Sequence, residues 1–120
     1  MITKPYRLDI IPGGSPLVIR LNQYDEDYIL ILELFAREGA FTLQSGTRAM
    51  IRGTKPNNEA YEASVTLSGN FATVRGDANM TDAAGTGVFE LCLKYNEKEL
   101  YTSNFEIEFE PSPMERGNGN

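Results

Sequence analysis

The chain has 120 residues, of which 41% are hydrophobic and 23% charged, and its net charge at neutral pH is −6. A chain of this length folds as one domain that buries roughly two thirds of its unfolded surface. The acidic balance argues against a nucleic-acid partner, because affinity for a phosphate backbone comes mainly from lysine and arginine.

In chain order, the first predicted strands cover residues 6–11, 17–22 and 28–36. The third is apolar on both faces, which predicts a central position in a sheet. The turn signals Pro12-Gly13-Gly14 and Asp25-Glu26-Asp27 separate these strands. The first strand is a candidate sheet edge.

The rest of the chain continues the same pattern. In the last predicted strand, Phe105, Ile107 and Phe109 alternate with glutamates, which predicts one buried and one solvated face. The main helical signal covers residues 78–84, with Asp77 as its N-cap and Gly85 as its stop. The further predicted strands are residues 47–53, 61–67, 71–76, 89–95 and 105–110.

About eight short strands separated by turns predict an all-β fold, either a sandwich or a barrel. This domain is expected to cover residues 1–110. Residues 111–120 contain Pro111, Pro113 and a final Gly-Asn repeat, and are expected to form a flexible C-terminal tail or linker.

No catalytic residue is predicted. The chain contains no histidine, so Cys92 lacks its usual base, and its alternation with Leu91 and Leu93 predicts a passive position on the opposite face of its strand. Glu106 and Glu108 would lie about 6.8 Å apart, near the spacing of inverting glycosidases. Three ionised carboxylates in a row leave no general acid, so a solvated face and a non-enzymatic protein are expected.

No metal or cofactor is predicted either. Asp77 and Asn79 match the first and third positions of an EF-hand loop, but Asp82 replaces the required glycine and Val88 the final glutamate. The triplet Asp25-Glu26-Asp27 favours a solvated turn over a cation site. The pattern therefore gives no ligand set.

No membrane partner is expected. The longest apolar stretch, residues 28–36, is far shorter than the roughly 20 residues of a membrane span. Residues 1–7 lack the apolar core of a secretion signal. The expectation is a protein made and kept inside a cell, which includes proteins assembled there and released by lysis.

Three segments carry a family resemblance. Residues 49–57 end a strand in Gly-Thr-Lys-Pro-Asn, residues 77–85 form a short helical segment that ends in Ala-Gly, and residues 101–107 enter the final strand through a Thr-Ser-Asn-Phe step. Together they resemble the N-terminal domain of the phage baseplate upper protein family, over nearly all of residues 6–109. Asn57-Asn58 stands where that family usually has Asp-Gly.

The resemblance implies an immunoglobulin-like antiparallel β-sandwich of about eight strands with one short helical turn. It also implies a non-enzymatic virion protein of a bacteriophage, which docks tail or baseplate fibre or receptor-binding parts for host attachment. The expected partners are other virion proteins and the chain itself as a symmetric oligomer. The expected location is the virion, assembled in the host cytoplasm.

Two alternatives stay open. The first keeps the virion and makes the chain a head fibre or capsid decoration base. The second is a carbohydrate-binding module, which would need outward aromatic side chains such as Tyr24, Tyr28 or Tyr101.

Overall fold

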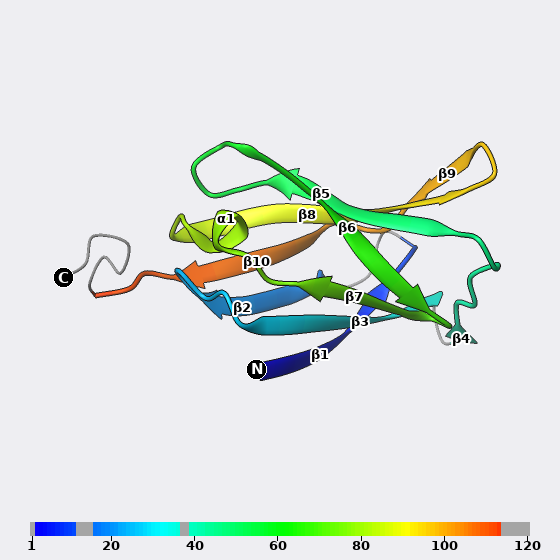
Figure 1. The fold of residues 1–120 in the computed structure, drawn as a ribbon, viewed down its shortest axis with the longest axis horizontal. Coiled ribbons are helices and arrows are strands. Elements are labelled where there is room, and N and C mark those ends of the chain that lie inside the picture. Colours follow the sequence, from blue (N-terminus) through cyan, green and yellow to red (C-terminus); the bar gives the residue numbers. More distant parts are fainter. Residues whose placement is uncertain (1, 12–15, 37–38, 114–120) are drawn as a thin grey trace.

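The structure, a computed structural model, describes residues 2–11, 16–36 and 39–113, which form ten strands and one short helix (Figure 1). Among these residues no helix is long and apolar enough to span a membrane. The elements are β1 (Ile2–Asp9), β2 (Val18–Asn22), β3 (Tyr28–Ala36), β4 (Gly39–Ala40), β5 (Arg48–Thr54), β6 (Ala60–Ser68), β7 (Phe71–Arg75), α1 (Ala78–Thr81), β8 (Gly85–Tyr95), β9 (Lys98–Tyr101) and β10 (Phe105–Glu110).

The strands form one continuous sheet in the order β1-β3-β7-β6-β5-β8-β10-β2, with β4 attached to β3 and β9 to β8. Strand β6 joins the two halves, because its residues 60–65 pair with β5 and its residues 66–68 pair with β7. The sheet wraps around a single core in a nearly closed barrel (Figure 1). The predicted all-β class is confirmed, and the first strand lies at an end of the sheet as expected.

The number of strands and their pairing both differ from the prediction. The described residues form ten strands where about eight were predicted, because β4 and β9 are too short to show an alternating pattern. The pairs β1–β3 and β2–β10 are parallel and not antiparallel. Parallel neighbours require a crossover connection, and the chain provides it by crossing from β1 to β2 at the far end of the sheet and then back to β3.

Two element boundaries also differ. β1 begins at Ile2, which pairs with Tyr28, so the strand starts earlier than its apolar pattern suggested. Helix α1 ends at Thr81 and not at residue 84. Gly85, with a φ of 116°, opens β8 instead of stopping the helix.

The predicted inner faces are confirmed. Phe105, Ile107 and Phe109 are at most 2% exposed, and the glutamates of β10 lie on the other face. β3 lies between β1 and β7, as predicted for a central strand. Alternation within each strand therefore decides which side chains form the core.

Phe89 sits at the centre of this core. Its ring stacks on Phe105 at a centroid distance of 6.3 Å and meets Tyr61 edge-on at 6.3 Å. A Cβ atom on Gly53 would lie 2.7 Å from Phe89 Cδ1, and one on Gly87 would lie 2.6 Å from Phe89 Cε2. Two neighbouring strands therefore carry glycine where the ring lies.

Replacing Phe105 with alanine should destabilise the domain by about 3 to 5 kcal/mol, because a buried ring is lost and its cavity cannot fully collapse. Glu106→Ala, at the adjacent position on the solvated face, is the matched control and should change stability by less than about 0.5 kcal/mol. Urea denaturation of both variants measures the difference. Equal losses would show that the two faces of β10 are assigned the wrong way round.

Candidate functional site

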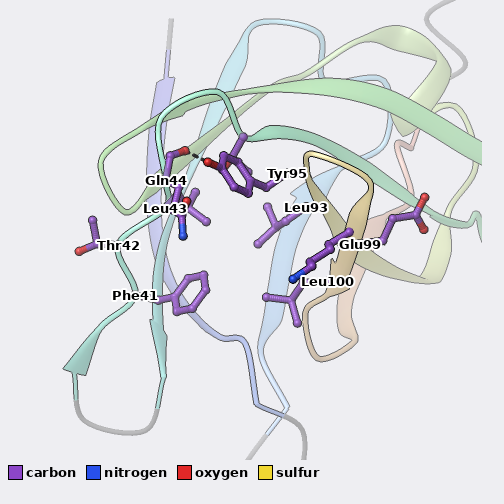
Figure 2. Close-up of a pocket in the computed structure, with 10 residues that line it drawn as sticks. Phe41, Thr42, Leu43, Gln44, Leu93, Tyr95, Glu99 and Leu100 are labelled. Carbon is purple, nitrogen blue, oxygen red and sulfur yellow. Dashed lines mark hydrogen bonds between the residues drawn. The ribbon is translucent and has the colours of Figure 1, made fainter.

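Different elements lie at the two ends of the molecule. Helix α1 covers one end, where the chain also leaves β10, and we call this the helical end: α1 with residues 23–27, 55–59 and 110–112 (Figure 1). At the other end, the β8–β9 hairpin and residues 41–47 flank a groove, which we call the open end (Figure 1, Figure 2). Each is a candidate contact surface.

Asp77 organises the helical end. Its carboxylate accepts a hydrogen bond from Met80 N at 2.7 Å, which confirms the predicted N-cap, and another from Tyr61 Oη at 2.8 Å. Met80 is fully buried, and Tyr28 donates its hydroxyl to Met80 Sδ at 2.8 Å. Desolvation by burial raises the pKa of Tyr28 and that of Tyr61, so both phenols stay neutral.

Lys55 is the least expected residue at this end. It is 2% exposed, and its Nζ lies 2.6 Å from Asp82 Oδ1, whereas the Asp82 side chain is 46% exposed. This contact pairs the charges but lies outside hydrogen-bond geometry, and no acceptor within the described residues hydrogen-bonds to Nζ. A buried ammonium therefore depends on one carboxylate that is itself half in water.

The turn that carries Lys55 is closed by a backbone hydrogen bond. Asn58 adopts a φ of 69° and donates its N–H to Lys55 O at 2.9 Å, as expected for an asparagine in this turn. Pro56 lies beside Gly85, where an added Cβ would be 3.1 Å from Pro56 Cβ. The two segments of the family resemblance, residues 49–57 and 77–85, thus meet at the Lys55–Asp82 pair.

Further hydrogen bonds join the β2–β3 turn to α1. Tyr24 N donates to Thr81 O at 2.8 Å, Gln23 Nε2 donates to Asp82 O at 3.0 Å, and Ser112 N donates to Gln23 Oε1 at 3.1 Å. Asp25 O accepts from Thr81 Oγ1 at 2.8 Å. The described part of the chain holds no group of three or more potential metal ligands, so its acidic turns are not gathered into a cation site.

The open end contains an apolar groove of about 320 Å³. Phe41 and Leu43, between β4 and β5, face Leu93 of β8 and Leu100 of β9 across it (Figure 2). Phe41 N donates to Leu34 O at 3.1 Å, and Thr47 Oγ1 donates to Gln44 O at 2.6 Å in the same segment. The remaining lining residues are Thr42, Gln44, Thr47, Tyr95, Lys98 and Glu99.

The groove combines apolar and polar lining residues. The apolar and aromatic ones are Phe41, Leu43, Leu93, Tyr95 and Leu100, and the charged ones are Lys98 and Glu99. Cys92 does not reach it: this buried cysteine lines a separate hollow with Met50 and Arg52, on the other face of β8 from Leu93. No sequence pattern indicated the groove, because its two walls come from segments far apart in the chain.

Comparison with known proteins supports a relation in fold. No protein-family model and no curated protein matches the sequence. The fold is similar to that of a phage protein domain. The N-terminal domain of phage TP901-1 ORF48 matches with a TM-score of 0.68 at 12% sequence identity, over 92% of this chain and 99% of that domain. The match takes in nearly all of both chains, so the whole fold is shared and not one motif.

Asp82→Asn should lower the stability of the domain by about 1 to 3 kcal/mol, because it leaves the buried Lys55 ammonium without an anion. Lys55→Met alone should change stability by less than about 1.5 kcal/mol, since an apolar side chain of similar size fills the same space. Denaturation midpoints of both variants and of the double variant measure the coupling.

The double variant should recover most of the stability that Asp82→Asn loses. Additive losses would show instead that Lys55 and Asp82 act independently and that the pair does not hold the helical end together.

Proposed function

We propose that this chain is a non-enzymatic structural module of a phage virion, an immunoglobulin-like domain of the baseplate upper protein type. In this proposal it docks tail or baseplate fibre or receptor-binding parts onto the particle for host attachment. The supporting observation is the fold shared with a phage protein domain over 92% of this chain. The segments that carry the family resemblance, residues 49–57 and 77–85, meet in the Lys55–Asp82 contact.

The two unlike ends suit such a role. The chain leaves the fold at the helical end, where Ser112 N donates to Gln23 Oε1. The β8–β9 hairpin, which borders the groove, lies at the opposite end (Figure 1). A module with an apolar contact surface at one end and its chain exit at the other can attach to one partner and carry another. Several copies around the axis of a particle would give the symmetric arrangement common in oligomers.

The carbohydrate-binding alternative finds less support. Tyr28 is 3% exposed, so its ring cannot stack on a sugar. Tyr101 is 41% exposed, but the Arg52 guanidinium lies 5.4 Å from its ring centroid and covers part of that face. The head-fibre or capsid alternative uses the same module and differs only in the partner.

Binding of the full chain to individually purified virion proteins tests the proposal. The probes are the tail, baseplate and head proteins of the phage or prophage that encodes it, with cell-wall glycans of the host as a parallel probe. We expect the chain to bind a tail or baseplate protein, measured by biolayer interferometry. Binding only to a head protein would favour the capsid alternative, and binding only to glycans would contradict a docking role.

A further inference from the structure

We infer that the groove and the free edge of β9 form one binding site for an extended segment of a partner protein. The partner segment carries apolar side chains at alternate positions and a carboxylate that reaches Lys98. The inference rests on the proposed docking function and deepens it, because it names the docking surface and the chemistry of the partner.

The first observation is the unpaired edge of β9. Within the described residues β9 pairs only with β8, in a hairpin whose two-residue turn is Asn96-Glu97, with Asn96 at a φ of 54°. In such a hairpin the flanking pair Tyr95/Lys98 is hydrogen-bonded, and bonded pairs recur at every second residue. Thr102 N donates to Leu91 O at 3.0 Å, which agrees with this register.

The register leaves backbone groups for a partner. The N–H and C=O groups of Glu99 and Tyr101 point away from β8, because those of the residues between and beside them are used in the hairpin. They offer two donors and two acceptors to an added strand. Strand addition of this kind takes its affinity from main-chain hydrogen bonds and its specificity from pockets for alternate side chains.

The second observation is that the groove lies on the face where those alternate side chains would fall. Leu93 and Leu100 are directly opposite each other on β8 and β9, and both line the groove. Every second side chain of a strand added beside β9 points to that face, toward Phe41 and Leu43. Leu100, which is 41% exposed, would then be covered.

The end of the sheet at β1 is less suitable. Ile10 N donates to Phe35 O at 2.9 Å, so even-numbered residues bond to β3 and odd-numbered residues face outward. Pro5 belongs to the outward set and has no N–H group, and Asp9 O already accepts from Ser103 Oγ at 2.6 Å. Proline on an edge strand interrupts the row that a new strand would need.

The end of the sheet at β2 lies away from the groove. Glu106 N donates to Leu17 O and Gln23 N donates to Glu110 O, which leaves Val18, Arg20 and Asn22 facing outward. The N–H of Asn22 already donates to Asp25 Oδ2 at 3.1 Å. Val18 and Arg20 remain, as many outward residues as on β9, but neither lines the groove.

The basic side chain that lines the groove is Lys98, which is paired with Tyr95 beside the hairpin turn. Lys94 and Glu99 are directly opposite each other in the β8–β9 hairpin, and their side chains alternate with Leu93 and Leu100 onto the other face. There the Glu99 carboxylate accepts a hydrogen bond from the Tyr101 hydroxyl at 2.5 Å. The groove face therefore presents the Lys98 ammonium, and a carboxylate at the end of the bound segment would pair with it.

Two variants test whether binding depends on the groove and on the edge of β9. Leu100→Ser removes an apolar contact in the groove, and Glu99→Pro removes an outward N–H that β8 does not use. Val88→Ser is the matched control, because Val88 is an exposed apolar strand residue, 43% against 41% for Leu100, and does not line the groove. Each full-length variant is measured against the individually purified virion proteins by biolayer interferometry, with amide hydrogen exchange of the wild-type complex as a second readout.

We expect the dissociation constant to rise at least about tenfold for Leu100→Ser and Glu99→Pro and to change less than about twofold for Val88→Ser. The amides of Glu99 and Tyr101 should become protected in the wild-type complex, a readout that holds even if a variant misfolds. Unchanged affinity in both variants, or no protection at these amides, would overturn this site and leave the docking function standing.

Failure of every virion protein to bind would overturn the docking function itself. A concentration-dependent dimer that Leu100→Ser abolishes, seen by light scattering, would show that a second copy of the chain occupies the groove and would overturn the assignment to a partner protein.

Discussion

A single sheet that encloses its own core has two ends that no strand can cover. The rest of this structure depends on which elements cover each end. The wrapping itself is achieved by β6, which pairs with β5 along one part and with β7 along another. At the helical end, α1 places Met80 over the core, and the β2–β3 turn donates a backbone hydrogen bond to α1. At the other end no such element is present among the described residues, and an apolar groove results.

The helical end includes the Lys55 ammonium, a charge that an apolar core disfavours. The aliphatic part of Lys55 occupies buried space, and its ammonium must find an anion, which Asp82 supplies from a position half in water. The pair couples the β5–β6 turn to the segment after α1. This coupling gives a physical reason for the Lys-Pro turn and the Ala-Gly segment to occur together in one domain, although neither contains a reactive group.

Patterns within a few residues predicted the features that depend on neighbouring residues alone. The inward set Phe105, Ile107 and Phe109 and the N-cap Asp77 follow from a period or a spacing within a few residues, and both are confirmed. The parallel pairing of β1 with β3, the burial of Lys55 and the groove could not be predicted in this way. Each of these features depends on segments that meet only after the chain has crossed the sheet. For Lys55 there is a second reason, because a lysine in a turn has the same sequence pattern whether its ammonium is solvated or buried.

We propose that the helical end is structural and that the open end makes the contact with the partner. Hydrogen exchange with mass spectrometry over the whole chain, free and bound to its virion partner, tests this proposal most directly. We expect protection on binding to be confined to residues 41–47 and 93–101, while residues 55–59 and 77–85 exchange as in the free chain. Protection centred on residues 55–59 and 77–85, with none at residues 93–101, would contradict it.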